Sequence, residues 1–334
     1  MKTHANASWR RAPGPAAAFL AVLLGTVFGC CTPTVPAGRM PDGWYWKEEP
    51  GKAVALVGPE GVLWQFSFGP ALHLPHFHPL ATTDGRTMTW DRPPDHPWHH
   101  ALWFAWKYIN GVNYWELDRK TGKSPGVTEW KPPRITARRD RSARIEMDLA
   151  YRPAGAEGKP VMTEHRVTEV SAPNSAGVYR VDWTTTFTAG EKDVTLERTP
   201  PPGEPGGKPW GGYAGLSVRL ANDMKDRAAT SSDGPVAMKG GTYRGKHTAM
   251  DYAGVISGKP VGIAILDHSK NLNAPTPWYV IIGKPMGYYS PAVICYKPHT
   301  LKAGESMTLR YRVLVHPGRW DAGRLKQEVK RFAR

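Results

Sequence analysis

The sequence has little cysteine and only one long apolar run, and these scarcities exclude whole classes of protein. Its 334 residues include three cysteines, too few for a disulfide scaffold or a cysteine-rich zinc site. The apolar run at residues 16–28 is shorter than the roughly 20 residues that span a bilayer. Walker loops, GxSxG elbows, HExxH helices and dinucleotide-binding fingerprints are all missing. No period of about 20 to 50 residues repeats, which argues against propellers and solenoids.

The first residues have the features of an export signal. Three basic residues precede the apolar run, which ends in Val-Phe-Gly-Cys30. This arrangement resembles a bacterial lipoprotein signal, in which the cysteine is lipidated and begins the mature chain. We therefore expect a signal peptide at residues 1–29, a lipid on Cys30 and a tether at residues 30–42. The alternative is an ordinary signal peptide cleaved nearby. Both interpretations predict an exported protein, either periplasmic, attached to the outer membrane or on the cell surface.

Alternating apolar and polar residues predict that the rest of the chain is mostly β-strand. Residues 62–68, 161–170, 178–187 and 305–315 have a period near 2, and 101–109, 145–151, 213–220 and 261–266 are further expected strands. The 35 glycines and 32 prolines argue against long helices. One short C-terminal helix is expected, with Asp321 as N-cap and an apolar stripe formed by Leu325, Val329 and Phe332. The predicted fold class is all-β, a large antiparallel β-sandwich that forms a single domain over residues 43–334.

Histidine is concentrated in one short stretch. Six of the twelve histidines lie between residues 73 and 100, in the segments His73-Leu-Pro-His76-Phe-His78-Pro and Asp95-His96-Pro-Trp98-His99-His100. Imidazole titrates near physiological pH and is the commonest metal ligand. Prolines stiffen both segments, and a stiff loop loses little entropy when it engages a ligand. These segments are therefore predicted to form the functional site.

Two chemistries fit these histidines. In one, His96 or His99 acts as a general acid or base, and Asp95 orients the ring. In the other, His76, His78, His96 and His99 hold a transition metal, with zinc and copper as the main candidates. The metal site requires the two segments to meet in space, which spacing alone does not show.

A further polar group follows the expected strand at residues 261–266. Asp267, His268 and Asn271 are suited to bind the hydroxyl groups of a sugar, and Trp278 is suited to cover its apolar face. An ordinary polar turn is the alternative. Three residues of the histidine segments, His78, Trp98 and His100, are additional candidates for substrate binding.

Several of these stretches together resemble the PmoA-like family of exported bacterial proteins, a family without an established activity. The similarity runs through His78-Pro-Leu, Asp84-Gly, Pro94-Asp-His-Pro, Leu102-Trp-Phe-Ala-Trp, and residues 110–115, 213–216, 266–278 and 303–316. That family commonly reads Asp-His-Pro-His-His-Arg-Gly-Leu, where this sequence has Trp98 for a histidine and His100-Ala101 for Arg-Gly. The resemblance implies a β-supersandwich of the galactose-mutarotase and polysaccharide-lyase kind, and by analogy a carbohydrate ligand. The family name alludes to a multi-helix subunit of methane monooxygenase, but this sequence has no repeated membrane-length runs, so methane oxidation is not expected.

The leading functional hypothesis is an enzyme that acts on a sugar or sugar derivative, as a lyase, isomerase or hydrolase, by His/Asp acid–base chemistry. One alternative is a copper- or zinc-binding oxidase or metal-handling protein that uses the same histidines. Another is a non-catalytic carbohydrate-binding lipoprotein. The expected partners are a small molecule or oligosaccharide and, through the lipid only, a membrane. Lysine and arginine outnumber aspartate and glutamate by 44 to 29, which favours acidic glycans or lipid headgroups over nucleic acid in an exported protein.

Overall fold

The chain folds almost entirely as antiparallel β-sheet. The computed structural model describes residues 34–36 and 38–333, which belong to one compact unit, Cys31–Arg334. The predicted signal peptide and Cys30 lie outside the described residues. Within the described part, no helix combines the length and the hydropathy that a membrane crossing requires.

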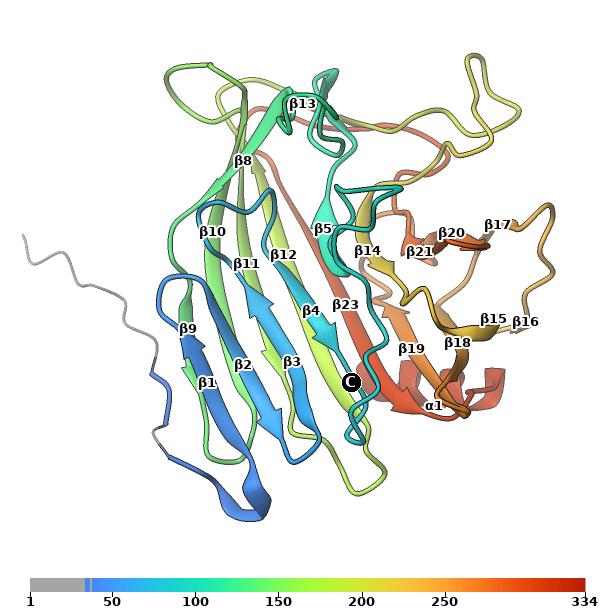
Figure 1. Ribbon diagram of the computed structural model, residues 1–334. Helices are drawn as coiled ribbons and strands as arrows, with labels where there is room; N and C mark the ends of the chain where they lie inside the picture. Colours follow the sequence, from blue (N-terminus) through green and yellow to red (C-terminus); the bar gives the residue numbers. More distant parts are fainter. Residues whose placement is uncertain (1–33, 37, 334) are drawn as a thin grey trace, which may run out of the picture. The chain divides into compact units, whose positions relative to one another are not determined.

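The first sheet has nine strands. In spatial order they are β1 (Tyr45–Glu49), β2 (Ala53–Gly58), β3 (Gly61–Ser67), β4 (His76–Leu80), β5 (Leu102–Ala105), β14 (Gly215–Arg219), β21 (Gly287–Pro291), β20 (Pro277–Ile282) and β17 (Thr242–Lys246). A 3-10 turn, η1 (Pro41–Gly43), precedes β1. The long connection between β4 and β5 carries the second histidine segment (Figure 1).

The second sheet has ten strands. Nine of them follow the order β16 (Gly234–Pro235), β15 (Lys225–Ser231), β18 (Ala249–Ile256), β19 (Lys259–Asp267), β23 (Ser306–Pro317), β12 (Tyr179–Ala189), β11 (Met162–Val170), β10 (Ala143–Pro153) and β8 (Gly126–Trp130), and β9 (Arg134–Ala137) also pairs with β10. A third sheet of four strands has the order β22 (His299–Leu301), β13 (Val194–Glu197), β6 (Tyr108–Ile109) and β7 (Val112–Asn113).

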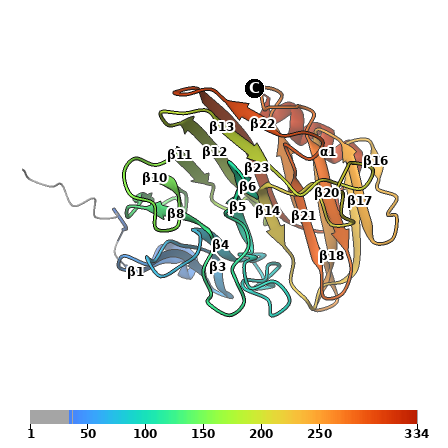
Figure 2. The same ribbon diagram turned by 90° about the horizontal axis from the view of Figure 1, so that it is seen from above.

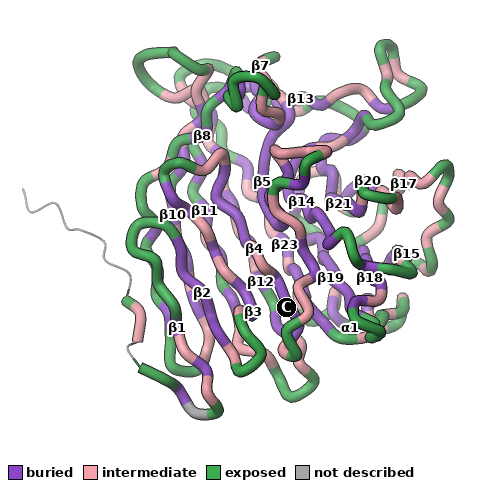
Figure 3. The backbone as a smooth tube through the Cα atoms, in the orientation of Figure 1, coloured by how far each residue is buried: buried purple, intermediate pink, exposed green. Residues whose placement is uncertain are grey.

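The two large sheets form a sandwich that is held together by aromatic side chains. The ring centroids of Phe77 in β4 and Trp183 in β12 are 6.2 Å apart, and those of Phe104 in β5 and Phe187 in β12 are 5.1 Å apart. Figure 2 shows the two sheets as layers, and Figure 3 shows that exposure is concentrated in turns and loops. Burial of these apolar faces is the main force that holds the layers together. The predicted all-β antiparallel sandwich is confirmed.

The strongly alternating segments are strands close to their expected bounds, as β3, β11, β12 and β23 show. The single strand predicted at residues 101–109 is divided into β5 and β6, because the chain leaves the nine-stranded sheet there and joins the four-stranded one. Trp106 and Lys107 occupy the break, and both are buried.

The predicted C-terminal helix is also confirmed, as α1 (Ala322–Phe332). Asp321 caps it by accepting a hydrogen bond from the backbone N–H of Arg324 at 2.7 Å. Leu325 is fully buried against Leu266 and Leu314 of the ten-stranded sheet, with Val329 and Phe332 packed beside it. The apolar stripe therefore attaches the helix to this sheet.

Phe187 provides a test of the sandwich, because its fully buried ring joins the two layers. We expect Phe187→Ala to lower the free energy of unfolding by about 3–5 kcal/mol, through lost burial and the cavity left behind. Urea denaturation followed by circular dichroism measures this change. The control is Val127→Ala, at a position that is 38% exposed, where we expect a change within about 0.5 kcal/mol. Equal effects of the two substitutions would contradict the described packing.

Candidate functional site

The loop from Asp91 to His100 is closed by its own backbone. Asp91 and His100 pair as an isolated antiparallel bridge, and the N–H of Arg92 donates to the carbonyl of His99 at 2.8 Å. Inside the loop, the N–H of His99 donates to the carbonyl of His96 at 2.9 Å. Ala101, directly after the loop, has a φ of 65°, a conformation that glycine adopts without steric cost. The loop therefore presents its side chains from a fixed backbone.

The loop divides the histidines into two groups. Side chains of consecutive residues in an extended chain point to opposite sides, and His99 and His100 line different cavities. His100 joins His73, His76 and Asp91 in what we call the Asp91 cluster, with His78 beside it. His99 joins His96 at a second place, which we call the aromatic cavity.

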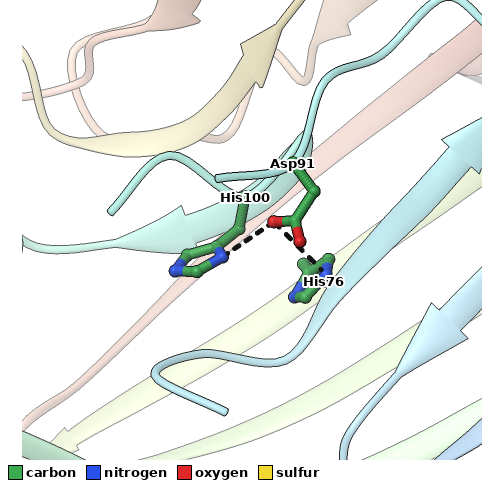
Figure 4. A group of neighbouring side chains, drawn as sticks. All are labelled: His76, Asp91 and His100. Atoms are coloured by element: carbon green, nitrogen blue, oxygen red, sulfur yellow. Dashed lines mark hydrogen bonds and ion pairs between the residues drawn. The ribbon is translucent and has the colours of Figure 1, made fainter. Parts of the chain in front are cut away.

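In the Asp91 cluster, side chains from β4 and from the loop meet around one carboxylate oxygen (Figure 4). His100 Nδ1 lies 3.0 Å from Asp91 Oδ1, and His76 Nε2 lies 3.6 Å from the same atom. The Nε2 atom of His100 lies 3.3 Å from His73 Nδ1. His76 Nδ1 is 2.9 Å from the carbonyl oxygen of Leu74. Because a carbonyl only accepts hydrogen bonds, His76 carries its proton on Nδ1.

Burial controls the charge of this cluster. It lowers the pKa of His73 to about 3, with His100 and Arg92 nearby acting in the same direction. It also lowers the pKa of His76 to about 4, although Asp91 partly opposes the shift. Burial alone would raise the pKa of Asp91, but the hydrogen bond from His100 and the nearby His76 and His78 bring it below its ordinary value. At neutral pH the cluster therefore combines the neutral rings of His73 and His76 with one carboxylate.

The four predicted metal ligands do not meet at one place. His76 belongs to the Asp91 cluster, whereas His96 and His99 line the aromatic cavity. His78 Nδ1 pairs with Thr89 Oγ1 at 3.1 Å. Within the described part of the chain, His76, Asp91 and His100 form the group whose three ligand atoms lie within 4.8 Å of one another. Both segments were predicted from the sequence, but Asp91, at the closed end of its loop, was not among the predicted ligands.

The aromatic cavity has a volume of about 320 Å³ and few polar groups. Its apolar walls are Ile281, Met286 and six aromatic residues, Trp98, Trp115, Trp210, Tyr213, Tyr279 and Tyr288. Three polar residues also line it, His96, His99 and Glu116, and the His96 and His99 rings stack with centroids 4.7 Å apart. A mostly apolar hollow with a few fixed polar groups is typical of a small-molecule site.

His96 is held by a carboxylate that is itself held by a buried cation. His96 Nδ1 lies 2.9 Å from Asp95 Oδ2, and both oxygens of Asp95 accept from Arg219 Nη2, at 2.9 and 2.8 Å. Arg219 is the last residue of β14 and is fully buried. Burial alone would raise the pKa of Asp95, but the hydrogen bonds from His96 and Arg219 lower it. The Nδ1 proton of His96 is thereby directed at Asp95, which leaves Nε2 as a proton acceptor.

His99 is more deeply buried than His96. Burial holds its pKa well below the ordinary value, and the nearby His96 and Arg219 act in the same direction, so the ring is neutral at pH 7. Its buried Nδ1 has no hydrogen-bond partner among the described residues. An unpaired acceptor is tolerated better than an unpaired N–H, so the proton belongs on Nε2, where it is available as a donor.

Glu116 is a site residue that was not predicted from the sequence. Its Oε1 accepts from the hydroxyl of Tyr213 at 2.8 Å, and its Oε2 accepts from Asn113 Nδ2 at 2.5 Å and from Lys107 Nζ. Asn113 Oδ1 in turn accepts from the N–H of Glu116 at 3.1 Å. An Asn three residues before a Glu is the local signal for such a turn, but the contact with Tyr213 is not local.

The polar group after β19 lies elsewhere. Asn271 Nδ2 donates to Asp267 Oδ1 at 2.8 Å, and burial raises the pKa of Asp267 to about 7. The His268 ring packs edge-on against Phe332 of α1, with ring centroids 5.4 Å apart. Trp278 is fully buried, and its Nε1 donates to the carbonyl of His247 at 2.8 Å. None of the four predicted residues lines the aromatic cavity, and their role in binding stays a prediction.

Comparison with known proteins shows the family to which the chain belongs and distant structural similarities. No curated protein matches the sequence. Among solved structures, the chain is similar to a "putative aldose 1-epimerase" from Klebsiella pneumoniae subsp. pneumoniae MGH 78578, with 9% identity and a TM-score of 0.42 over 90% of this chain and 86% of that one. It is also similar to a polysaccharide lyase, with 12% identity and a TM-score of 0.30, over 83% of this chain but only 34% of the lyase.

The sequence match is to a family model named DUF6807 and described as a family of unknown function, which covers residues 56–330. A PmoA-like name does not form part of this match, and that resemblance stays a prediction. The family description gives no activity. The chain belongs to the DUF6807 family.

Proposed function

We propose that this protein is an enzyme that acts on a sugar or sugar derivative by acid–base chemistry in the aromatic cavity. The observation that carries the proposal is the His96–Asp95 pair, held by buried Arg219, at a hollow with six aromatic wall residues. Aromatic faces cover the apolar C–H faces of a sugar, and the polar groups bind its hydroxyls. A cavity of about 320 Å³ is near the lower end of the usual range for ligand sites, which fits a small sugar or one end of a chain.

In this proposal, His96 is the base and His99 is the donor. In the neutral ring the Nδ1 proton of His96 is engaged by Asp95, and Nε2 is the atom that takes up a proton. When His96 takes up a proton, the Asp95 carboxylate stabilises the imidazolium that forms. Neutral His99, stacked against it, adds no repelling charge and offers an Nε2 proton to an oxygen of the substrate.

The carboxylate content of the cavity favours proton transfer over hydrolysis. Glycoside hydrolases commonly use two carboxyl groups, one on each side of the bond that breaks. Of the described residues that line this cavity, Glu116 is the one carboxylate, and Tyr213, Asn113 and Lys107 fix it in place. Its role is then to bind hydroxyl groups of the substrate. The reaction classes that fit are a lyase and an isomerase that works through a carbanion or enediol, since both need a proton removed from carbon and a second group near the leaving or receiving oxygen.

We further propose that the protein is exported and held at a membrane by a lipid on Cys30, as the basic and apolar start of the sequence supports. In a bacterial host, the full-length chain is expected in the membrane fraction with a lipid-sized mass increase on Cys30. Cys30→Ser is expected to remove that increase and release the protein. Mass spectrometry of the membrane and soluble fractions measures this modification. Unmodified Cys30 in soluble parent protein would contradict the proposed lipid anchor.

The proposed activity predicts exchange of a carbon-bound proton with solvent. The protein is incubated in D₂O with a panel of sugars, sugar acids and short oligosaccharides, and proton NMR follows loss of individual C–H signals. We expect one substrate class to exchange or react, and His96→Ala to lower the rate by about 100-fold or more, the contribution typical of a positioned base. His165→Ala is the matched control, because His165 pairs with Asp148 at 2.7 Å on the exposed face of β11.

The NMR outcomes separate the possible functions. New reducing ends without C–H exchange would support a hydrolase. Ligand line broadening without any reaction would support a non-catalytic sugar-binding protein, and in that case Trp98→Ala would weaken binding more than His96→Ala. Unchanged turnover in folded His96→Ala protein would contradict the assignment of His96 as the base.

Because Asp95 forms an ion pair with buried Arg219, we expect the effects of substituting them on the unfolding free energy to be strongly coupled. Asp95→Ala leaves the Arg219 guanidinium buried without its ionic partner, so we expect it to cost about 3–5 kcal/mol of unfolding free energy. The double variant Asp95→Ala/Arg219→Met removes the buried charge as well and is expected to recover part of that loss. Denaturant unfolding of the parent, both single variants and the double variant measures the coupling. Additive effects would show that the pair does not hold the loop.

A further inference from the structure

The Asp91 cluster lies outside the aromatic cavity, and the proposed acid–base chemistry does not use it. Its ligand atoms come from two separate segments, with His76 on β4 and Asp91 and His100 at the two ends of the loop. We propose that His76, Asp91 and His100 bind one divalent transition-metal ion, with zinc as the representative ion.

The distances within the cluster fit such an ion. Zinc bonds to imidazole nitrogen and carboxylate oxygen are about 2.0–2.2 Å long, so two ligand atoms of a tetrahedral site lie roughly 3.4 Å apart. The separations from Asp91 Oδ1 are 3.0 Å to His100 Nδ1 and 3.6 Å to His76 Nε2, on either side of that value. The three ligand atoms lie within 4.8 Å of one another, so the two rings need only a small rotation to converge on an ion.

The outer hydrogen bond of His76 already places this imidazole in the tautomer that a metal requires. A metal-binding histidine usually donates its other N–H to a carbonyl, a carboxylate or another acceptor, and this fixes the orientation of the ring. His76 does so through Nδ1 to the carbonyl of Leu74 at 2.9 Å, which leaves Nε2 unprotonated toward Asp91. His100 Nδ1 donates to Asp91 in the metal-free cluster, so metal binding removes the proton from that nitrogen. His73 Nδ1, 3.3 Å from His100 Nε2, is the acceptor for the remaining N–H of His100 when the ion is bound.

His76 Nε2 also needs a positive partner. It lies 3.6 Å from Asp91 Oδ1, too far for a hydrogen bond, and with its proton on Nδ1 it presents a lone pair to a carboxylate. Two electron-rich atoms that face each other in a buried place repel, and a cation between them reverses the sign of the interaction. His73 and His100 of the cluster also line a neighbouring cavity of about 510 Å³, and Asp91 is partly exposed.

The chemical nature of the three ligand atoms limits which metal ions can bind. Two imidazole nitrogens and one carboxylate suit zinc, iron, nickel or copper, whereas calcium and magnesium prefer all-oxygen sites. Three protein ligands leave at least one coordination position open, which is the arrangement of catalytic rather than structural zinc.

Zinc titration of metal-free full-length protein by isothermal calorimetry tests the proposal. The expected result is one equivalent bound by the parent. Asp91→Asn and His76→Gln are each expected to weaken binding by more than about 100-fold, since changes to outer partners alone cost about 10- to 100-fold. His73→Ala, which removes only an outer partner, is expected to fall within that smaller range. X-ray absorption of the zinc complex should show nitrogen and oxygen at about 2.0–2.1 Å and no sulfur at about 2.3 Å.

Two controls locate the ion. His96→Ala and His165→Ala are expected to bind zinc as the parent does, because neither side chain belongs to the cluster. Circular dichroism establishes that each variant is folded; if Asp91→Asn is not, the His73→Ala titration and the absorption spectrum of the parent decide. No binding by the folded parent would overturn the proposal and leave the cluster as a hydrogen-bonded chain from His73 to Asp91. Loss of zinc in His96→Ala, or equal binding by His73→Ala and the parent, would overturn the assigned location.

Discussion

The buried guanidinium of Arg219 holds the histidine loop against the nine-stranded sheet. It donates to both oxygens of Asp95 and, at 3.0 Å, to the carbonyl of Pro285, and Trp90 lies against it with its ring centroid 5.3 Å away. Arg219 ends β14, which pairs with β5 on one side and with β21 on the other. A buried cation cannot give up its carboxylate without a large cost. The position of Asp95, and through it that of His96, is therefore set by the sheet rather than by the loop alone.

The second constraint is the alternation of side chains in extended backbone. His99 and His100 are adjacent in the sequence, yet one faces the aromatic cavity and the other faces Asp91. Because adjacent side chains point to opposite sides, one histidine-rich segment contributes to two places with different chemistry. One has a histidine oriented by a carboxylate at an aromatic hollow. The other has two imidazole nitrogens gathered around one carboxylate oxygen.

What the sequence could predict was local. Period-2 alternation identified β11, β12 and β23, and an N-cap followed by an apolar stripe identified α1. The clustering of histidines and the prolines among them identified the loop from Asp91 to His100 as a candidate site. The partners that define the site are distant in the sequence, since Arg219 lies 124 residues from Asp95 and Tyr213 lies 97 residues from Glu116. No local pattern marks such pairs. For the same reason the sequence did not show that β20 places Trp278, a predicted sugar-stacking residue, in the core.

The clustered histidines are divided between two separate places, the Asp91 cluster and the aromatic cavity. Long-range ¹⁵N NMR of the imidazole rings, recorded during a zinc titration of histidine-labelled protein, tests this claim most directly because it reports each ring nitrogen. We expect the signals of His76 Nε2 and His100 Nδ1 to shift together, while those of His96 and His99 stay in place. Joint shifts of His96 and His99 would show a single shared site and would contradict the division into two.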